Sequence, residues 1–215
     1  MKESTWPRLI LGSTSPYRRA LLSQWGVPFD VQAPHVDETP AAQEPPIELA
    51  RRLAQAKAHA VARACPAGDD VIVIGSDQVA DLDGEPIGKP GTHDKAVAQL
   101  QAMRGRSVLF HTAVAVTRPR TGFIALDIST VRVHMGQYSD ADLHTYLQIE
   151  QPYDCAGSAK SEGIGVTLLE RIDSSDPTAL IGLPLIVTAR LLRQAGLDLL
   201  AWRAALNAPS TANSN

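Results

Sequence analysis

The stretch of residues 9–22 constrains the fold most, because it joins a strand, a turn and a helix without a spacer. Three apolar residues predict a strand over 9–11, and the small residues of 12–15 predict a tight turn. Ser15 is a favoured N-cap, and Pro16 suits the first helical position because its missing N–H would have no partner there. The turn therefore directs backbone N–H groups, hydroxyl groups and the positive end of a helix dipole at one place.

Basic side chains follow this turn closely. Arg18 and Arg19 lie one turn into the expected helix, and Ser13 adds a hydroxyl group. These groups outline an anion site that would suit phosphate. A capped amphipathic helix with solvated arginines explains this stretch equally well when it is taken alone.

The size and charge of the chain limit the possible functions. Its 215 residues are enough for one sizeable domain, or for two small lobes around a shared cleft. The formal net charge of −3 argues against a nucleic-acid partner, which needs a broad basic face. A small anionic ligand stays possible because it needs only a few local basic groups.

The cysteines and the first residues bear on location. Cys65 and Cys155 fit neither a zinc pattern nor a disulfide framework, so they suit a reducing compartment as plain thiols. The N-terminal residues lack the apolar run of a signal peptide, and no later run is long enough to span a membrane. We therefore expect a cytoplasmic protein with no membrane partner.

Apolar periodicity and turn residues predict the other elements. We expect helices over 16–24, 47–63, 94–103, 140–150 and, as the last one, 184–195. We expect strands over 27–31, 71–74, 79–82, 107–117, 123–134 and 166–172, with 107–117 and 123–134 forming a long antiparallel hairpin.

A carboxylate follows the most buried-looking strand. Residues 71–74 are all β-branched, and Asp77 comes shortly after them. In α/β proteins the carboxyl ends of strands open into the crevice, which favours a catalytic role for Asp77. The alternative is that Asp77 only caps a turn. The nearby Gly88-Lys89-Pro90 is no standard phosphate loop, because Pro90 stands where Ser or Thr should be.

Seven motifs in chain order resemble the Maf family of nucleoside triphosphate pyrophosphatases. They are Ser-Thr-Ser-Pro-Tyr-Arg-Arg at 13–19, Val-Asp-Glu at 36–38, Ala-x-x-Lys ending at Lys57, Gly-Ser-Asp-Gln at 75–78, Gly-Lys-Pro at 88–90, Gly-Ser-Ala-Lys-Ser-Glu-Gly at 157–163 and Gly-Leu-Pro at 182–184.

The resemblance implies an α/β, inosine triphosphatase-like fold. It has two lobes, a mixed twisted sheet with flanking helices and a central cleft, and is often a homodimer. We expect one such domain over 8–200, an N-terminal extension over 1–7 and a disordered tail over 207–215. The resemblance also implies hydrolysis of a nucleoside triphosphate to the monophosphate and pyrophosphate with a divalent cation, Mg²⁺ or Mn²⁺, which removes noncanonical nucleotides.

Three positions vary with the base within this family, and here they hold Tyr17, Gln78 and Glu162 in place of the more common Arg, Thr and Gln. This set is similar to the subgroup that hydrolyses 7-methyl-GTP. Methylation at N7 makes guanine cationic, so a tyrosine face attracts it where an arginine would repel it. A carboxylate accepts from both N1–H and the exocyclic amine. The alternatives are neutral drift, or a structural Tyr17 together with a Glu162 that holds Lys160.

The resemblance and the residue types together suggest a division of roles. We expect Asp77 to be the general base that orients water, or else a direct metal ligand, and Glu38 to help hold the metal. The triphosphate is expected to meet Ser13 and the cations Arg18, Lys57 and Lys89, while for Arg19 the alternative of a solvent-facing side chain stays open. Two other functions stay open: a pyrophosphatase for dTTP, UTP or a deaminated purine, and a non-catalytic nucleotide-binding regulator of cell division.

Overall fold

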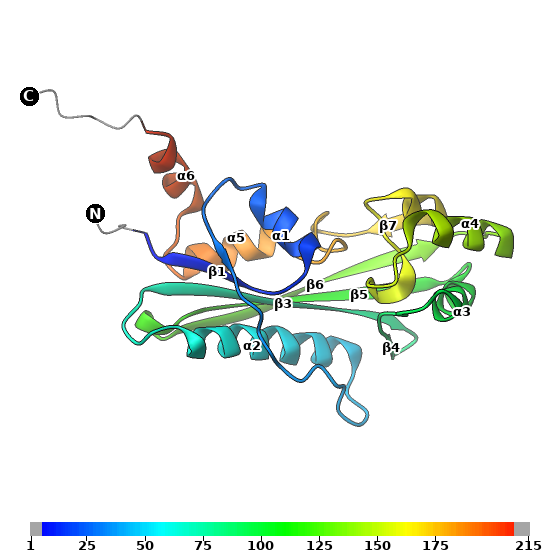
Figure 1. Cartoon of the computed structure of the whole chain (residues 1–215), viewed down its shortest axis with the longest axis horizontal. Helices are drawn as coiled ribbons and strands as arrows, with labels where there is room; N and C mark the ends of the chain where they lie inside the picture. Colours follow the sequence, from blue (N-terminus) through cyan, green and yellow to red (C-terminus); the bar gives the residue numbers. More distant parts are fainter. Residues whose placement is uncertain (1–5, 209–215) are drawn as a thin grey trace, which may run out of the picture.

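The computed structural model describes residues 6–208, which form a mixed, twisted sheet with helices on both faces (Figure 1). The α/β class expected from the sequence is therefore confirmed. Most of the N-terminal extension expected over 1–7 and of the tail expected over 207–215 lies outside the described residues. Asn207 itself is the last residue of a helix.

Within the described part of the chain, seven strands form one sheet in the order β2-β1-β3-β5-β6-β7, and β4 pairs with β3 beside this path. The pairs β1–β2 and β1–β3 are parallel, and the other pairs are antiparallel. The strands are β1 (Arg8–Gly12), β2 (Asp30–Val31), β3 (Val71–Leu82), β4 (Glu85–Ile87), β5 (Ser107–Arg118), β6 (Phe123–Met135) and β7 (Leu169–Asp173).

Helices connect and cover these strands. The α-helices are α1 (Pro16–Ser23), α2 (Pro46–Ala64), α3 (His93–Met103), α4 (Asp140–Glu150), α5 (Leu185–Gln194) and α6 (Leu199–Asn207). Three short 3₁₀ helices are η1 (Pro119–Thr121), η2 (Ala156–Ser158) and η3 (Ile164–Leu168). Among the described residues, no helix combines the length and the apolar character needed to cross a bilayer.

The predicted hairpin is confirmed as the pair β5–β6, whose register runs without a break from Ser107–His134 to Arg118–Phe123. The turn between the strands contains η1 and ends at Gly122, whose φ of 70° is a left-handed conformation that glycine adopts without strain.

Several predicted boundaries are wrong. The strand expected over 27–31 is reduced to Asp30 and Val31, because only Ile10 and Leu11 of β1 pair with it. The strand expected from residue 166 starts at Leu169, after η3. Helix α6 follows the helix that was expected to be the last one. It buries only Trp202.

The central strand β3 is a larger correction. Two short strands with a break at 75–78 were expected, but β3 runs through this segment as one strand of 12 residues. The partner β5 explains the continuity, because each residue from Val73 to Asp81 pairs with it. Cross-strand hydrogen bonds therefore override the local turn preference of Gly75 and Ser76.

One face of the sheet is covered by α2, which lies along it below β3 in Figure 1. Gly75 makes this contact possible: a Cβ at this position would lie 2.3 Å from the carbonyl oxygen of Ala54 and 2.4 Å from the backbone nitrogen of Ala58. The backbones of α2 and β3 therefore touch at Gly75, and this fixes the height of α2 along the strand.

The other face supports two separate clusters of buried side chains, which form the two expected lobes. The first joins β1 and α1 to α5 and α6, with Leu22 and Trp202 among its members. The second joins β5 and β6 to α3 and α4 and includes Leu100 and Leu147. Both clusters rest on β5, which gives the lobes a shared floor.

Gly75→Ala tests the close contact of α2 with β3. We expect the free energy of unfolding to fall by about 1–3 kcal/mol, because the added methyl group pushes against backbone atoms that cannot move independently. Urea denaturation measures the change. Gly88→Ala is the control, because no atom lies within 4 Å of its added Cβ, and its effect should stay within about 0.5 kcal/mol. Equal stability of the two variants would contradict this packing argument.

Candidate active site

A cleft of about 730 Å³ lies between the lobes and draws its walls from segments far apart in the sequence. It is lined by every residue that we expected to bind or act on substrate: Ser13, Tyr17, Arg18, Glu38, Lys57, Asp77, Gln78, Lys89 and Glu162. Arg19 is exposed and lies outside the cleft, in a shallow depression beside β2. The fold therefore brings the nine residues together and leaves Arg19 apart.

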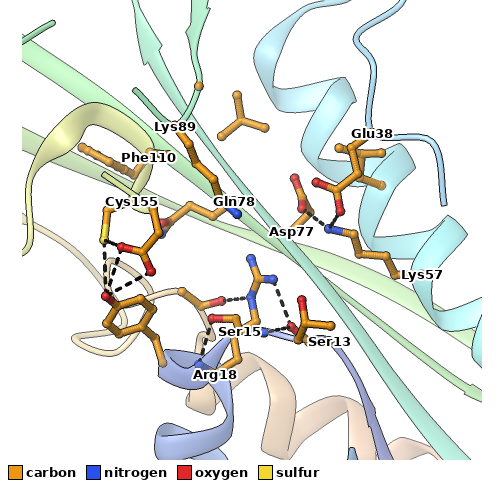
Figure 2. Close-up of a pocket in the computed structure, with 18 of the residues that line it drawn as sticks. Ser13, Ser15, Arg18, Glu38, Lys57, Asp77, Gln78, Lys89, Phe110 and Cys155 are labelled. Atoms are coloured by element: carbon orange, nitrogen blue, oxygen red, sulfur yellow. Dashed lines mark hydrogen bonds and ion pairs between the residues drawn. The ribbon is translucent and has the colours of Figure 1, made fainter. Parts of the chain in front are cut away.

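The turn before α1 has the hydrogen bonds of a capped helix start. The Ser15 hydroxyl accepts from the backbone nitrogen of Arg18 at 3.4 Å, as an N-cap does. The Ser13 hydroxyl accepts from the backbone nitrogen of Ser15 at 3.1 Å. These bonds fix the turn so that Ser13 lies at the bottom of the cleft (Figure 2).

Arg18 points from α1 into the middle of the cleft (Figure 2). Its Nε donates to the carbonyl oxygen of Gly182 at 2.8 Å, and its Nη1 donates to the Ser13 hydroxyl at 3.4 Å. Burial lowers the pKa of Arg18 below its usual value, and the carboxylates of Asp77 and Glu38 oppose this effect. The guanidinium stays charged because the ordinary pKa of arginine is so high.

Lys57 lies between two carboxylates. Its Nζ is 2.7 Å from Oδ1 of Asp77 and 2.6 Å from Oε1 of Glu38 (Figure 2). The side chains of Lys57 and Asp77 are only 6% and 9% exposed, whereas that of Glu38 is 55% exposed. One ammonium therefore joins a buried carboxylate on β3 to a solvated one on the loop before α2.

The two carboxylates respond differently to this cation. Burial raises the pKa of Asp77, and Arg18 and Lys57 offset only part of the rise. Burial also raises the pKa of Glu38, but its hydrogen bond and charge interaction with Lys57 bring the net value below the usual one. Asp77 is thus the carboxylate that binds a proton more readily, as a general base must.

The sequence argument placed Asp77 correctly in the cleft but for a reason that is wrong. Asp77 does not follow the end of a strand; it lies in the middle of β3, opposite Ala113 of β5. Its side chain lies on the same side of β3 as Gly75, the side that α2 covers, and there it meets Lys57 of α2 at the wall of the cleft. The turn-cap alternative is also wrong, because no turn is present there.

Gln78 has a fixed orientation. Its Nε2 lies 3.0 Å from the carbonyl oxygens of Ala179 and Leu180 and 2.9 Å from the hydroxyl of Thr112. Carbonyl oxygens only accept, so the amide nitrogen must face them. The Oε1 atom of Gln78 is then available as an acceptor for a ligand.

The far end of the cleft contains Tyr17 and several charged groups. The Tyr17 hydroxyl lies 3.5 Å from both carboxylate oxygens of Asp154 and accepts from the Cys155 thiol at 3.6 Å. The Lys160 ammonium lies over the Tyr17 ring, 5.5 Å from its centroid. Lys160 pairs at 2.7 Å with Glu150 on α4, so the alternative in which Glu162 holds Lys160 is wrong.

Sequence reasoning missed several residues of the cleft. Phe110 on β5 was assigned only to a strand, because alternation along a strand does not tell which face meets a ligand. Asp154 and Cys155 shortly precede the motif at 157–163 and line the cleft, but no signal in the sequence singled them out. The carbonyl oxygen of Gly182, which Arg18 contacts, belongs to the Gly-Leu-Pro motif, so the motif was seen but not its role.

The carboxylates of Glu38 and Asp77 fit a hard divalent cation. They converge on the same ammonium, and among the described hydrogen bonds none engages the second oxygen of either one. Carboxylate oxygens together with substrate phosphates are the usual ligands of Mg²⁺. A cluster of three or more potential protein ligands is absent from residues 6–208, so phosphate oxygens would have to complete such a site.

Comparison with known proteins identifies one family and relatives that share one name. The family model described as "Maf-like protein" matches residues 8–195. A protein of Albidiferax ferrireducens is 57% identical over 93% of this chain and 99% of its own length. A protein of Polaromonas sp. is 58% identical over 91% and 88%, and one of Paraburkholderia xenovorans is 59% identical over 90% and 95%. All three relatives are named 7-methyl-GTP pyrophosphatase.

Lys57→Met tests the pairing at the centre of the cleft. We expect the free energy of unfolding at pH 8 to fall by about 3 kcal/mol, because Asp77 then stays buried without its ammonium. The pKa of Asp77 in the folded variant rises further above its unfolded value. The loss is therefore largest above that folded pKa and shrinks as the pH falls toward the unfolded value.

Denaturation of this variant at pH 8 and pH 5 measures both effects. Arg51→Met is the control, because Arg51 forms an exposed pair with Glu48 on the same helix and should cost less than about 1 kcal/mol at either pH. A loss for Lys57→Met that does not change with pH would contradict the role given to Asp77.

Proposed function

The chain belongs to the Maf family, and we propose that it is a nucleoside triphosphate pyrophosphatase that converts 7-methyl-GTP to 7-methyl-GMP and pyrophosphate and so removes a modified nucleotide. The observation that carries the proposal is the buried carboxylate of Asp77, which interacts with the cations Arg18 and Lys57 in a cleft that Lys89 also lines. The names of the relatives agree with this activity.

The bond that breaks lies between the α- and β-phosphorus atoms. Water attacks the α-phosphorus in line with the leaving pyrophosphate, so the protein contributes mainly orientation and charge neutralisation. Asp77 is the proposed general base that orients this water and accepts its proton. Its raised pKa, caused by burial, brings the carboxyl closer to the working pH and makes it a better base.

Neutralisation of the triphosphate falls to the cationic side chains. Arg18 is already oriented by Gly182 and Ser13, so little freedom is lost when it binds phosphate. Lys57 can exchange part of its contact with the solvated Glu38 for a phosphate oxygen, while it keeps Asp77. Lys89 is exposed on the opposite wall of the cleft, where its ammonium can neutralise charge on the leaving pyrophosphate.

A divalent cation, Mg²⁺ or Mn²⁺, would be held by Glu38 and Asp77 together with phosphate oxygens. When bound, it supplies positive charge that stabilises the phosphates and the leaving pyrophosphate. The alternative is that Asp77 would hold this cation directly instead of acting as the base.

Base choice is assigned to Tyr17, Gln78 and Glu162. Glu162 supplies a carboxylate that can accept from N1–H and the exocyclic amine of guanine. Gln78 can contribute a further acceptor, because its Nε2 is held by two carbonyl oxygens and its Oε1 then faces the ligand. The positive charge of 7-methylguanine complements the negative charge of the Glu162 carboxylate. A neutral pyrimidine base offers no such charge interaction.

The cellular setting is also part of the proposal. Both cysteines are free thiols, as a reducing cytoplasm would keep them. A homodimer, which the family resemblance implies, is supported by Ile164, Val166 and Ile172. These side chains are at least 41% exposed on η3 and β7, beside the outer edge of the sheet. Neither nucleic acid nor membrane is among the proposed partners.

The substrate assignment is tested with purified protein, Mg²⁺ and a panel of 7-methyl-GTP, GTP, UTP, dTTP and deoxyinosine triphosphate. We expect the kcat/KM for 7-methyl-GTP to exceed that for each other nucleotide by at least about tenfold, measured by pyrophosphate release, because a single favourable charge contact provides this factor. Equal turnover of GTP and 7-methyl-GTP would refute the charge argument. Preference for UTP or dTTP would support the pyrimidine alternative, and binding without pyrophosphate release would support a regulator.

Asp77→Asn tests the mechanism. The amide keeps the size of the side chain but cannot take a proton from water, so we expect kcat to fall by about 10³-fold or more. Binding of 7-methyl-GTP without divalent cation, measured by calorimetry, should change by less than about threefold. Turnover close to the wild type would remove Asp77 from the role of base.

A further inference from the structure

The end of the cleft around Tyr17 contains more negative charge than the proposed base contacts use. Glu150 and Glu162 interact with the ammonium of Lys160, and Asp154 lies beside the Tyr17 hydroxyl. Lys160 is neutralised by Glu150, since the two form an ion pair at 2.7 Å. Among the described residues, no ion pair engages Asp154 or Glu162. Two carboxylates without a direct ion pair among the described residues therefore line this end of the cleft.

Asp154 is held beside the cleft by neutral donors only. The Tyr17 hydroxyl lies 3.5 Å from both of its carboxylate oxygens, and the Cys155 thiol lies 3.5 Å from one of them. Dashed lines beside the labelled Cys155 in Figure 2 mark the contacts of its thiol. The contacts are long, and Asp154 is exposed, so its carboxylate keeps acceptor capacity for a ligand.

The face of Tyr17 is less available than its hydroxyl. The Lys160 ammonium already lies 5.5 Å from the ring centroid, which is the position of a bound cation on an aromatic face. A cationic base can contact only the part of the Tyr17 ring that the Lys160 ammonium leaves uncovered. The hydroxyl, in contrast, is the group that contacts Asp154.

We propose that Asp154 is a further specificity residue, a second carboxylate beside Glu162 that selects a positively charged purine, and that Tyr17 positions it through its hydroxyl group. This inference rests on the proposed function, because it assumes that the base lies at the Tyr17 end of the cleft and the phosphates at the Arg18 end. A neutral purine gains hydrogen bonds here but no charge complementarity.

The acidic groups nearby report the same negative environment. Burial raises the pKa of Cys155 to about 11, and the charges of Asp154 and Glu162 add to the rise. Burial likewise raises the pKa of Tyr17, with further contributions from Cys155, Asp154 and Glu162. Both groups therefore stay neutral at physiological pH and add no negative charge to that of the two carboxylates.

The test compares Asp154→Asn with the wild type on 7-methyl-GTP and GTP. We expect the ratio of the two kcat/KM values to fall by about tenfold, because one charge contact in a partly solvated site is lost. The change should appear mainly in KM for 7-methyl-GTP, since Asp154 lies away from the reacting phosphorus. Asp154→Glu keeps the charge and should retain most of the preference.

Asp69→Asn is the matched control. Asp69 is exposed in the turn between α2 and β3 and does not line the cleft, so the same loss of charge there should leave the ratio unchanged. An equal drop in both variants would mean that only net charge matters, and would overturn the assignment of Asp154.

The positioning role of Tyr17 needs a double-variant cycle. Tyr17→Phe keeps the ring under Lys160 but removes the hydroxyl, so we expect the substrate ratio to fall. In a protein that already carries Asp154→Asn, adding Tyr17→Phe should then change the substrate ratio little further. Additive effects of the two changes would show that Tyr17 acts independently of Asp154, and would overturn this part of the inference.

Calorimetric binding of 7-methyl-GTP and GTP in EDTA separates this inference from the proposed function. If the wild type binds 7-methyl-GTP more tightly and Asp154→Asn loses that preference, the inference stands even if no pyrophosphate is released and the proposed function fails. If pyrophosphate is released but Asp154→Asn keeps the full preference, the inference is overturned while the proposed function stands. Equal binding of both nucleotides by the wild type overturns the inference as well.

Discussion

The arrangement of the cleft depends on the ammonium of Lys57, which lies between the carboxylates of Asp77 and Glu38. Lys57 is on α2 and Asp77 on β3, so the pair forms only if these elements pack at one height. Gly75 sets that height because its missing side chain lets the backbones touch. A charge pair this buried is stable only with good geometry, and here the packing of a helix on a strand provides it.

The same packing divides the cleft into two electrostatic regions. The cations Arg18, Lys57 and Lys89 lie near Asp77 or Glu38, whereas Asp154 and Glu162 lie near Tyr17 and form no ion pair within residues 6–208. A ligand with an anionic tail and a cationic head would fit this polarity in one orientation only. The neighbouring residues Arg18 and Tyr17 of α1 belong to different regions, and the cleft between the two lobes contains both regions.

Much of the site could be predicted from the sequence, but not how its parts contact one another. The capped turn at Ser15 and the hairpin were predicted correctly, because they depend on local preferences. The position of Asp77 was predicted for a wrong reason, since pairing with β5 extends β3 through a segment that looks like a turn. Glu162 was considered as the partner of Lys160, yet Glu150 on α4 takes that place.

The sequence by itself determined which chemical groups are available: a helix start suited to an anion, basic residues for phosphates, carboxylates for a cation or a base, and a tyrosine where the family more often has an arginine. Only the tertiary structure decided which of them meet. Tyr17 and Asp154 are 137 residues apart, and Arg18 and Gly182 are 164 residues apart. Contacts at such separations follow from the order of strands in the sheet and from where the lobes leave it uncovered, and no local pattern of residues carries that information.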